Sequence, residues 1–282
     1  MLLFSSKKEL IAHLATLKNT STAVGLVPTM GALHKGHLSL IKKAISETKV
    51  VVISVFVNPT QFDNQDDLKN YPNTLDTDLE TLKTVSEELI VFAPSVTELY
   101  SGNISSKEYD FDGLDTTMEG KFRSDHFLGV ATVVEKLFSI VKPTKAYFGE
   151  KDFQQLLIIK KLVEKTNMPI KIIGCPIVRE PHGLAMSSRN ERLPKDLRDK
   201  ASFIYETLLA AKEIFGTKSA SNVMDWVINK FDKQPEFDLE YIKITDQDTL
   251  KPVKRKQKNT KYRAFIAVYA NGVRLIDNIA LN

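Results

Sequence analysis

The chain has 282 residues, of which 43% are hydrophobic and 26% charged, so it is long enough for one large or two moderate globular domains. Its net charge is +4 at pH 7, but the run at residues 251–261 holds six basic residues and no acid, which leaves the rest of the chain at −2. No apolar run approaches the roughly 20 residues of a membrane span, and the N-terminal segment becomes charged within a few residues, so we expect neither a membrane protein nor a secretory signal.

The first 180 residues alternate helix-like and strand-like segments. A short amphipathic helix over residues 10–17 comes first. Apolar, β-branched runs then predict buried parallel strands at residues 22–29, 51–58, 88–95, 145–150 and 170–178. Amphipathic runs predict helices between them, at residues 37–49, 75–88, 126–142 and 152–166. This alternation is typical of an α/β fold with a doubly wound parallel sheet, of the Rossmann-like kind.

Two of these helices have a clear inward face. In the helix at 37–49, spacing places three apolar residues on one side: Leu38, Ile41 and Ile45. In the helix at 126–142, five do so: Phe127, Val130, Val134, Leu137 and Phe138.

The pattern changes after residue 190. A proline and an acidic first turn begin a long amphipathic helix over residues 194–215. Strand-like runs follow at 237–246 and 262–281, and the second contains Asn271-Gly272, a strong signal for a hairpin turn. We therefore expect a Rossmann-like domain at residues 1–184, and a smaller α+β domain at residues 185–282.

The only cysteine, Cys175, lies in the apolar run at 170–178. We expect a small buried side chain, because no base lies close in sequence to activate a nucleophile. One cysteine allows no disulfide within the chain, which fits a cytoplasmic protein.

The basic run at 251–261 allows two interpretations. Such a run is typical of a solvated loop, and it is also the signature of a nucleic-acid-binding patch. No aromatic residue interleaves with it before Tyr262, so it lacks a stacking platform. We expect a solvated loop and no nucleic-acid partner.

Two histidines, His34 and His37, flank a glycine between the first strand of the series and its helix. A helix N-terminus offers unpaired N–H groups and a partial positive charge, which attract phosphate. Gly31 and Gly36 allow the backbone to approach a ligand closely. The pair therefore allows three interpretations: ordinary helix-start residues, a phosphate cradle, or a metal pair. The metal pair is disfavoured, because no cysteine, third histidine or carboxylate follows at ligand spacing.

Four more polar clusters lie at strand ends, at helix starts or in a loop. Asn58 and Gln61 come directly after the second strand of the series, where a simple turn is the alternative. Asp76 and Asp78 lie in the first turn of a helix, a position typical of capping, with a magnesium role as the weaker alternative.

The other two clusters lie at 148–155 and 186–190. The first, FGEKDFQQ, joins a strand to a helix; there Lys151 is suited to neutralising a phosphate and Asp152 to binding ribose or capping. The second, MSSRN, offers two hydroxyls, an arginine and backbone N–H groups, and is either a loop that closes over a triphosphate or a plain serine-rich linker.

In this order the motifs resemble the pantothenate synthetase family, the pantoate–β-alanine ligases. The resemblance runs from about residue 22 to the end and rests on PTMGALHKGH, VFVNPTQF, YPNTLDTDL, HFLGVATVVEKLF, FGEKDFQQL, GLAMSSRN, EYIKITDQDTL and RLIDNIAL. His34-x-Gly36-His37 is similar to the HIGH-type signature of nucleotidylyltransferases, and residues 186–189 are similar to their mobile KMSKS-type loop. The resemblance implies ATP and Mg²⁺, the substrates pantoate and β-alanine, and a homodimer.

The resemblance also implies roles for individual residues. The catalytic residues would be His37 as general acid, His34, Lys151 and Arg189. The nucleotide would be bound by Met30, Gly31, Ala32, Leu33, His34, Lys35, Gly36, His37, Gly149, Glu150, Lys151, Asp152, Val178, Met186, Ser187, Ser188 and Arg189. Pantoate or β-alanine would be bound by Gln61, Gln155, Asn58, Arg123 and His126. The metal ligands stay unassigned. Pantoate would attack the α-phosphorus of ATP, and β-alanine would then displace AMP from the adenylate.

One stretch departs from the family pattern. The family usually has Arg-Pro-Gly-His-Phe-Arg-Gly, whereas this chain has RSDHFLG at residues 123–129. A carboxylate, Asp125, is gained and a cation is lost at Leu128, beside residues expected to bind anions. Because Arg123 and His126 are kept, we expect Asp125 to face solvent and activity to remain.

Two further functions stay open from the sequence. One is a related nucleotidylyltransferase that acts on another small acid or phosphate, and pyrophosphate exchange across candidate acids separates it from a pantoate ligase. The other is an RNA-binding relative that uses the basic run, which predicts salt-sensitive RNA affinity.

Overall fold

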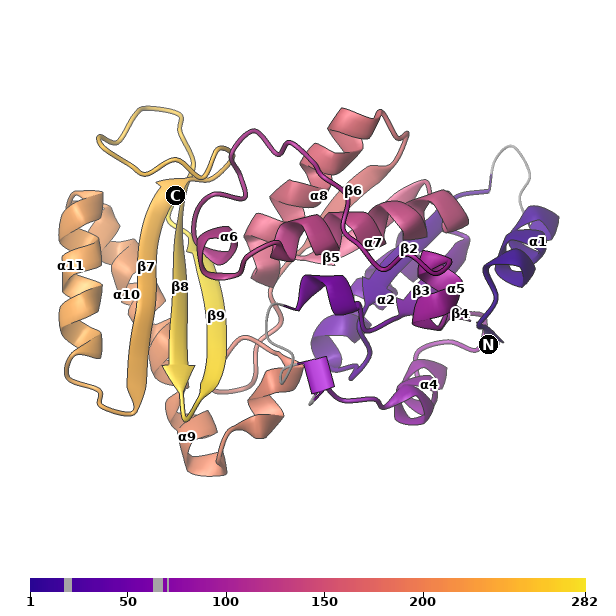
Figure 1. The fold of residues 1–282 in the computed structure, drawn as a ribbon. Coiled ribbons are helices and arrows are strands. Elements are labelled where there is room, and N and C mark those ends of the chain that lie inside the picture. Colours follow the sequence, from indigo (N-terminus) through magenta and orange to yellow (C-terminus); the bar gives the residue numbers. More distant parts are fainter. Residues whose placement is uncertain (18–21, 63–67, 70) are drawn as a thin grey trace. The chain divides into compact units, whose positions relative to one another are not determined.

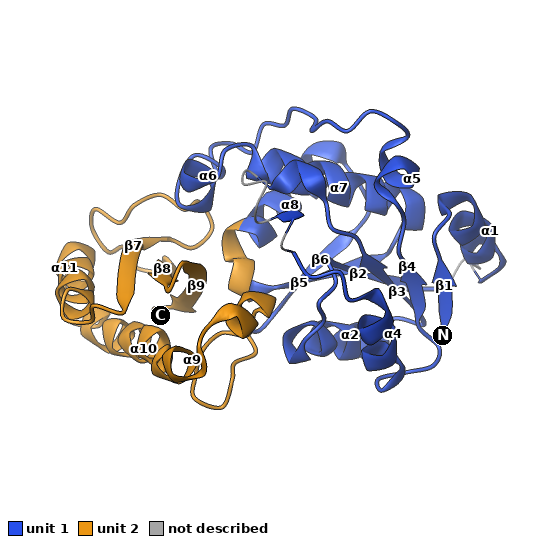
Figure 2. Cartoon of the chain, turned by 60° about the horizontal axis from the view of Figure 1, so that its bottom comes forward, with its two compact units in different colours: residues 1–150, 155–176 blue, residues 151–154, 177–282 orange. Residues whose placement is uncertain are grey.

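The chain forms two compact units in the computed structural model, which describes residues 1–17, 22–62, 68–69 and 71–282 (Figures 1 and 2). The first unit comprises residues 1–150 and 155–176, and the second comprises residues 151–154 and 177–282. The boundary expected at 184/185 lies inside the second unit. Residues 151–154 belong to the second unit, although the residues on either side of them belong to the first.

A parallel sheet of six strands forms the centre of the first unit, in the order β1-β4-β3-β2-β5-β6 (Figure 1). The strands are β1 (Leu2–Phe4), β2 (Val24–Thr29), β3 (Val50–Val55), β4 (Ile90–Phe92), β5 (Lys145–Gly149) and β6 (Lys171–Cys175). All five predicted strands are present. The edge strand β1, which has three residues and pairs with β4, was not predicted.

Helices cover both faces of this sheet. Figure 2 shows α7 (His126–Val141) and α8 (Phe153–Thr166) on one face, and α2 (Lys35–Glu47) and α4 (Leu75–Lys83) on the other. The strand order explains this arrangement: the chain goes from β2 to β3 and β4 in one direction and from β5 to β6 in the other, and right-handed crossovers then place the helices on opposite faces. The order reverses between β2 and β5. At such a point the carboxyl ends of the strands leave a crevice for a ligand.

Shorter helices complete the first unit: α1 (Lys7–Leu17), η1 (Pro59–Gln61), α5 (Val96–Tyr100) and α6 (Glu119–Phe122), while η2 (Glu150–Asp152) spans the change of unit. The predicted inward face of α7 is confirmed, since all five of its residues are buried. The predicted face of α2 is partly wrong: Leu40, Ile41 and Ala44 are buried, whereas Ile45 is 40% exposed. The helix contacts β2 and β5 most, and this turns the row that begins at Leu40 inward.

The second unit contains an antiparallel sheet with helices beside it. The strands are β7 (Phe237–Asp246), β8 (Tyr262–Ala270) and β9 (Val273–Ala280). The helices are η3 (Ser188–Arg192), α9 (Lys195–Lys200), α10 (Ser202–Phe215) and α11 (Ala220–Phe231). The Asn271-Gly272 hairpin is confirmed; both residues have positive φ, +46° and +73°, as a type I′ turn requires. The predicted helix over 194–215 is divided after α9, and α11 was not predicted.

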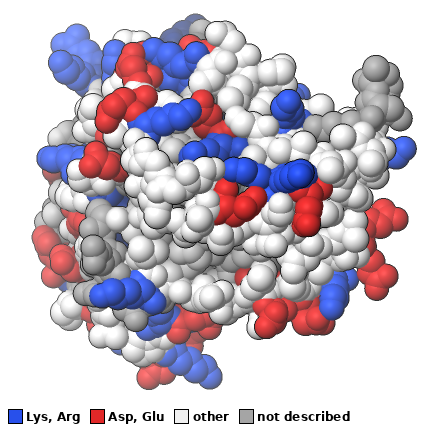
Figure 3. All heavy atoms as spheres, turned by 45° about the vertical axis from the view of Figure 1, so that its right-hand side comes forward, with Lys and Arg blue, Asp and Glu red and all other residues white. Residues whose placement is uncertain are grey.

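The basic run at 251–261 lies between β7 and β8 as an exposed, irregular loop, as expected. One of its lysines is used in packing: Lys256 lies 4.3 Å from the ring centroid of Phe215 and donates a hydrogen bond to the Phe215 carbonyl. On the face shown in Figure 3, basic and acidic side chains are interspersed. Within the described ranges, no helix is both long and apolar enough to cross a membrane.

Candidate active site

The loop that follows β2 is held by backbone N–H groups that donate to side chains. Gly31 N donates to Thr29 Oγ1 (3.2 Å), Ala32 N to Asp78 Oδ2 (3.0 Å) and Leu33 N to Asp78 Oδ1 (2.7 Å). Gly31 has φ of +79°, and a Cβ there would lie 2.9 Å from Asp78 Oδ2. A glycine is therefore required at 31, both for the conformation and for the close approach of the carboxylate.

Asp78 acts as a cap for this loop rather than only for its own helix. It is 2% exposed, and Oδ2 also accepts from Thr74 Oγ1 at 3.2 Å. Both carboxylate oxygens are thus occupied by protein donors. In the described part of the chain, no group of three or more His, Cys, Asp or Glu side chains is arranged to hold a metal ion. The contacts favour the capping interpretation of Asp78 over the magnesium one.

His34 and His37 form a reciprocal capping box at the start of α2. Gly36 N donates to His34 Nδ1 (3.1 Å), and His34 N donates to His37 Nδ1 (3.3 Å). Since each Nδ1 accepts a proton donor, each neutral imidazole carries its own proton on Nε2. The two rings lie side by side, with centroids 4.1 Å apart. Helix capping and ligand binding are therefore compatible roles, because capping uses Nδ1 and makes Nε2 a donor.

Asn58 and Gln61 lie after β3, at the ends of the short helix η1. Asn58 is 1% exposed; its Nδ2 donates to Gly129 O (3.1 Å) and to Gln61 Oε1 (3.3 Å). Its Oδ1 accepts from Tyr100 Oη at 2.6 Å, and burial raises the pKa of Tyr100, which keeps that phenol protonated. The Asn58 side chain thus contacts protein on both ends of its amide. Because Oε1 of Gln61 accepts from Asn58, the other end of the Gln61 amide is its NH₂ group, which is a donor. This NH₂ group donates to Met30 Sδ at 2.7 Å.

Arg123 and His126 lie at the start of α7. His126 Nδ1 donates to Gln61 O at 2.8 Å, so its Nε2 is the acceptor for Arg123 Nη1 at 3.0 Å. Asp125, between them, is exposed, as expected. Its φ is +56°, in the left-handed region that favours glycine. This backbone requirement accounts for the glycine that the family usually has at this position.

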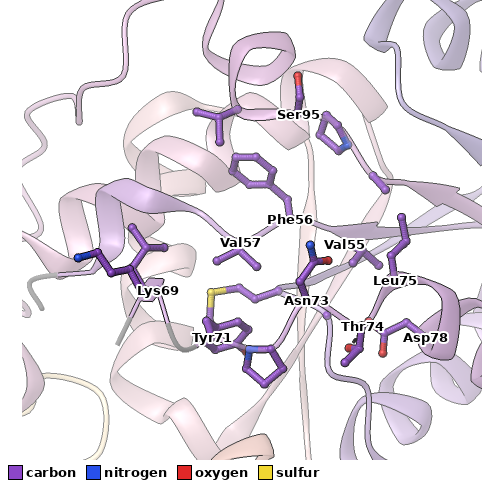
Figure 4. Close-up of a pocket in the computed structure, with 17 residues that line it drawn as sticks. Val55, Phe56, Val57, Lys69, Tyr71, Asn73, Thr74, Leu75, Asp78 and Ser95 are labelled. Atoms are coloured by element: carbon purple, nitrogen blue, oxygen red, sulfur yellow. Dashed lines mark hydrogen bonds between the residues drawn. The ribbon is translucent and has the colours of Figure 1, made fainter. Parts of the chain in front are cut away.

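A cavity of about 430 Å³ opens at the carboxyl ends of β2, β3 and β4 (Figure 4). Most of its lining is apolar, with Val55, Phe56 and Val57 among the residues that line it. It shares Met30 and Gly31 with the predicted site, and Asp78 and Thr74 with the contacts that hold the loop. The loop after β2 therefore has this cavity on one side.

The turn after β5 contributes residues to both units. Gly149 and Glu150 belong to the first unit, as does the half-buried Gln155 on α8. Lys151 belongs to the second unit, with its side chain 18% exposed and its Nζ 3.9 Å from Asp152 Oδ1. The Lys151 carbonyl accepts from Asn278 Nδ2, on β9, at 2.9 Å.

Residues 178–190 form a hairpin of the second unit, and all the residues predicted from the MSSR motif lie on it. Met186 N donates to Val178 O (3.0 Å) and Glu180 N to Leu184 O (2.8 Å). Ser187 caps the short helix η3, where its Oγ accepts from Arg189 N at 3.3 Å. Met186, Ser187, Ser188 and Arg189 are all half-buried.

Two ion pairs join the hairpin to other elements of the second unit. Arg179 donates to Asp277 at 2.6 and 3.0 Å and stacks 3.5 Å from the ring centroid of Tyr205. Arg198 donates to both carboxylate oxygens of Glu180, at 2.9–3.2 Å. Burial by itself raises the pKa of Glu180, but the bonds from Arg198 and Asn190 outweigh it and hold the pKa below its usual range.

Cys175 is buried, as expected, at the end of β6. Burial raises the pKa of its thiol to about 11. The thiolate is the reactive form, so a thiol with such a pKa is a poor nucleophile at neutral pH.

Comparison with known proteins identifies the family. The family model described as pantoate-beta-alanine ligase matches residues 2–280. The chain belongs to the pantoate–β-alanine ligase family. It is 54% identical to the pantothenate synthetase of Flavobacterium psychrophilum and 53% identical to that of Christiangramia forsetii, in each case over 100% of both chains.

Solved structures agree with this family assignment. The pantothenate synthetase of Thermus thermophilus is similar with a TM-score of 0.91 and 39% identity, covering 100% of this chain and 99% of that one. The pantoate-beta-alanine ligase of Francisella tularensis, solved in complex with beta-gamma ATP and beta-alanine, is similar with a TM-score of 0.83 and 38% identity, covering 100% and 98%. The predicted α/β fold with a smaller second domain and the predicted ligase activity are confirmed. Nothing in these comparisons supports a nucleotidylyltransferase that acts on another acid.

The motif residues of this pantoate–β-alanine ligase were predicted from the sequence, whereas the residues that hold those motifs in place were not. No role was predicted for four of these residues: Tyr100, Arg179, Asp277 and Asn278. For Asp78, the predicted role was capping of its own helix. A weak signal existed for Asp277 and Asn278, since they lie in RLIDNIAL, one of the motifs that carried the resemblance. The buried partners themselves lie up to 127 residues away along the chain, and no spacing rule identifies them.

Proposed function

We propose that the chain joins pantoate to β-alanine through a pantoyl adenylate, with the predicted residues in the roles that the resemblance implies. In the first step a pantoate carboxylate oxygen attacks the α-phosphorus of ATP, and the bond from that phosphorus to the bridging oxygen of pyrophosphate breaks. In the second step the amine of β-alanine attacks the acyl carbon, loses a proton, and AMP leaves. Such transfers need mainly charge neutralisation and alignment rather than a protein nucleophile.

The single observation that carries the proposal is the histidine capping box at the carboxyl end of β2. Because Nδ1 of each ring accepts from a backbone N–H, each neutral imidazole of His34 and His37 carries its proton on Nε2, at the N-terminus of α2. Together these donors suit the oxygens of a triphosphate. We assign residues 30–37 to the phosphates, with His37 donating from Nε2 to the departing pyrophosphate and His34 beside it.

Residues 149–152 and the hairpin at 178–189 complete the nucleotide assignment. Lys151 neutralises phosphate charge and Asp152 accepts from the ribose hydroxyls. Val178 contacts adenine through its backbone, and residues 186–189 bind the phosphates, with Arg189 supplying the charge. The mostly buried Lys151 side chain supports this role, since a desolvated cation acts more strongly on phosphate. The second domain then acts as a lid over ATP.

Pantoate is assigned to Gln61 and Gln155, with Gln61 also near β-alanine. The orientation of the Gln61 amide supports the assignment, because a carboxylate needs donors and the amide presents its NH₂ group. Asn58 and His126 contribute by holding Gln61: Asn58 bonds its side chain and His126 its carbonyl. Arg123 adds positive charge at the same place and donates to His126.

Mg²⁺ is proposed as part of the substrate, carried on the phosphates of ATP. Magnesium is usually held by one or two carboxylates together with substrate phosphates, rather than by an all-protein cage. The occupied oxygens of Asp78 and the absence of a metal cluster among the described residues agree with this arrangement. Removal of Mg²⁺ with EDTA is expected to abolish pyrophosphate release, and excess Mg²⁺ to restore it.

The remaining proposals concern assembly and location. The resemblance supports a homodimer, which light scattering after size-exclusion chromatography tests. The single cysteine supports a cytoplasmic protein, which cell fractionation tests.

The decisive experiment is incubation with ATP and pantoate but without β-alanine, followed by mass spectrometry. We expect pantoyl adenylate and one pyrophosphate per adenylate, and AMP release only when β-alanine is added. Pyrophosphate release that does not depend on pantoate would contradict the proposed order of steps.

A further inference from the structure

Two adjacent residues of β9, Asp277 and Asn278, are polar and almost fully buried, with 4% and 2% exposure. Neither has a place in the proposed chemistry. Consecutive residues of a strand point to opposite faces of the sheet, so this dipeptide can hold one segment on each side. Their contacts show which segments these are.

Asp277 holds the hairpin that carries Val178 and Arg189. Its two carboxylate oxygens accept from Arg179, at 2.6 and 3.0 Å, and Oδ1 also accepts from Asn278 N at 2.7 Å. Arg179 in turn donates to Gly183 O (3.0 Å) at the tip of the hairpin. The ion pair therefore fixes both the base and the tip of the hairpin relative to β9.

Asn278 holds the turn that carries Lys151. Its Nδ2 donates to Lys151 O (2.9 Å), and its Oδ1 accepts from Arg263 Nη1, on β8. The Arg263 guanidinium also lies 3.8 Å from the ring centroid of Phe153, two residues after Lys151. The turn at 151–153 is thus fixed to the sheet at its backbone and at its aromatic side chain.

We propose that Asp277 and Asn278 are positioning residues that set the hairpin at 178–189 and the turn at 151–153 relative to each other for ATP binding. The proposal rests on the proposed function, which assigns Lys151 and Arg189 to the phosphates. Adjacent Cα atoms in a chain are about 3.8 Å apart, so two segments that bond to adjacent residues keep a nearly constant separation. The hairpin, the turn at 151–153, β8 and β9 all belong to the second unit.

The test begins with two substitutions of Asn278 in the full-length protein. Asn278→Asp keeps the acceptor for Arg263 and loses the donor to Lys151 O, whereas Asn278→Ala loses both without adding charge. In a pantoate-dependent pyrophosphate assay we expect each to raise KM for ATP about tenfold, because a displacement on the order of 1 Å can cost up to about 100-fold in rate or binding. KM for pantoate should stay within about twofold of the wild-type value.

The control is Arg274→Gln, a substitution on the same strand as Asn278, which breaks the ion pair of Arg274 with Glu240 on β7. A purely structural loss would lower kcat in proportion to the folded fraction and leave KM for ATP unchanged, in the control as in the test variants. Wild-type KM for ATP in folded Asn278→Ala protein would overturn the proposal. A rise in Asn278→Asp alone would also overturn it, because it would reflect the added charge.

Lys151→Ala separates failure of this proposal from failure of the proposed function. If Lys151→Ala leaves KM for ATP and kcat unchanged, the assignment of Lys151 to phosphate is wrong and the positioning role of Asn278 falls with it. If Lys151→Ala is impaired and the Asn278 variants are not, only the positioning role is wrong. In the double variant, Asn278→Ala should add less than about twofold to Lys151→Ala; an independent further loss would overturn action through Lys151.

Asp277 is tested by hydrogen exchange. Asp277→Asn should accelerate amide exchange across residues 178–189, since it removes the charge that holds Arg179, and Asn278→Ala should leave that segment unchanged. Unchanged exchange of the hairpin in Asp277→Asn would overturn its part of the proposal.

Discussion

The two units hold their proposed ATP-contacting segments by different means. In the first unit, five backbone N–H groups within residues 31–36 donate to side chains of residues 29–37 and of Asp78 on the neighbouring helix α4. In the second unit, the segments are fixed by side chains from other elements, through Arg179–Asp277, Arg198–Glu180 and the bond from Asn278. The His34–His37 bond spans three residues of chain, whereas the Arg179–Asp277 pair spans 98.

The two kinds of anchoring should respond differently to damage. A helix start that is capped by its own residues forms whenever the helix forms, so its donors are ready before the ligand binds. A hairpin fixed by ion pairs keeps its position only while the surrounding sheet and helices are intact. Damage to the packing of the second unit should therefore affect the hairpin first, whereas the helix start in the first unit should be affected only by substitution of the capping residues themselves.

The largest expected effect comes from His37, where capping and chemistry use different ring nitrogens. In His37→Asn, the amide oxygen takes the place of Nδ1 and still accepts from His34 N, but the Nε2 donor is lost. We expect adenylate formation to fall by about 100- to 10,000-fold, the usual contribution of a positioned proton donor, while ATP still binds. Single-turnover formation of pantoyl adenylate measures the loss, and ATP binding is followed by calorimetry.

The matched variant is His37→Gln, whose amide nitrogen reaches toward the position of Nε2. It should recover part of the activity that His37→Asn lacks. Wild-type rates in His37→Asn would show that His37 only caps the helix.

A smaller effect is expected from Asp78→Asn, which weakens the hydrogen bonds that hold the loop after β2. One of the two backbone donors, Ala32 N or Leu33 N, would then face an NH₂ group instead of an oxygen. Leaving a buried donor unsatisfied costs about 1–3 kcal/mol, and we expect that loss in the free energy of unfolding, with about tenfold slower adenylate formation. Asp76→Asn, exposed in the same helical turn, is the control and should change stability by less than about 1 kcal/mol. Equal effects in the two variants would mean that Asp78 matters only to its own helix.

The ion pair between Arg198 and Glu180, which holds the hairpin of the second unit, should be sensitive to acid. The lowered pKa of Glu180 means that its charged form is favoured by folding, so its contribution is complete above its unfolded pKa, near 4.5, and is lost as pH falls below that value. At pH 7, Glu180→Gln should lower the free energy of unfolding by on the order of 2 kcal/mol. The difference from wild type should shrink as pH falls below 4.5.

Urea unfolding at pH 7 and at pH 3.5 measures this difference. Glu191→Gln is the control, since Glu191 also pairs with Arg198 but is 72% exposed, and it should change stability by less than about 1 kcal/mol at either pH. A gap between Glu180→Gln and wild type that does not change with pH would contradict the prediction.

The contrast between the halves also explains what the sequence could predict. The strands, the hairpin at Asn271-Gly272 and the helix start at His34 depend on residues within a few positions of each other, and local patterns identified them. Other features depend on residues that are neighbours only in space. These are the edge strand β1, the division of the helix at 194–215 and the choice of which face of α2 is buried. In the same way, the motifs that we propose to contact ATP could be recognised locally, but Asp277 and Asn278 were not assigned a role, because their partners lie 98 and 127 residues away.

Asp125 gives the smallest expected effect and the most direct link between a sequence departure and backbone geometry. With φ of +56°, the residue is in a conformation that costs most L-amino acids about 1–2 kcal/mol, though aspartate adopts it more readily than most. Asp125→Gly should therefore stabilise the protein by less than about 1 kcal/mol, whereas Asp125→Ala should destabilise it. Because the carboxylate is exposed, KM for ATP and for pantoate should stay within about twofold of wild type in Asp125→Gly. A more than tenfold lower KM for either substrate would mean that the negative charge of Asp125 weakens the binding of that anionic substrate. Backbone strain alone would then no longer explain why glycine is usual at this position.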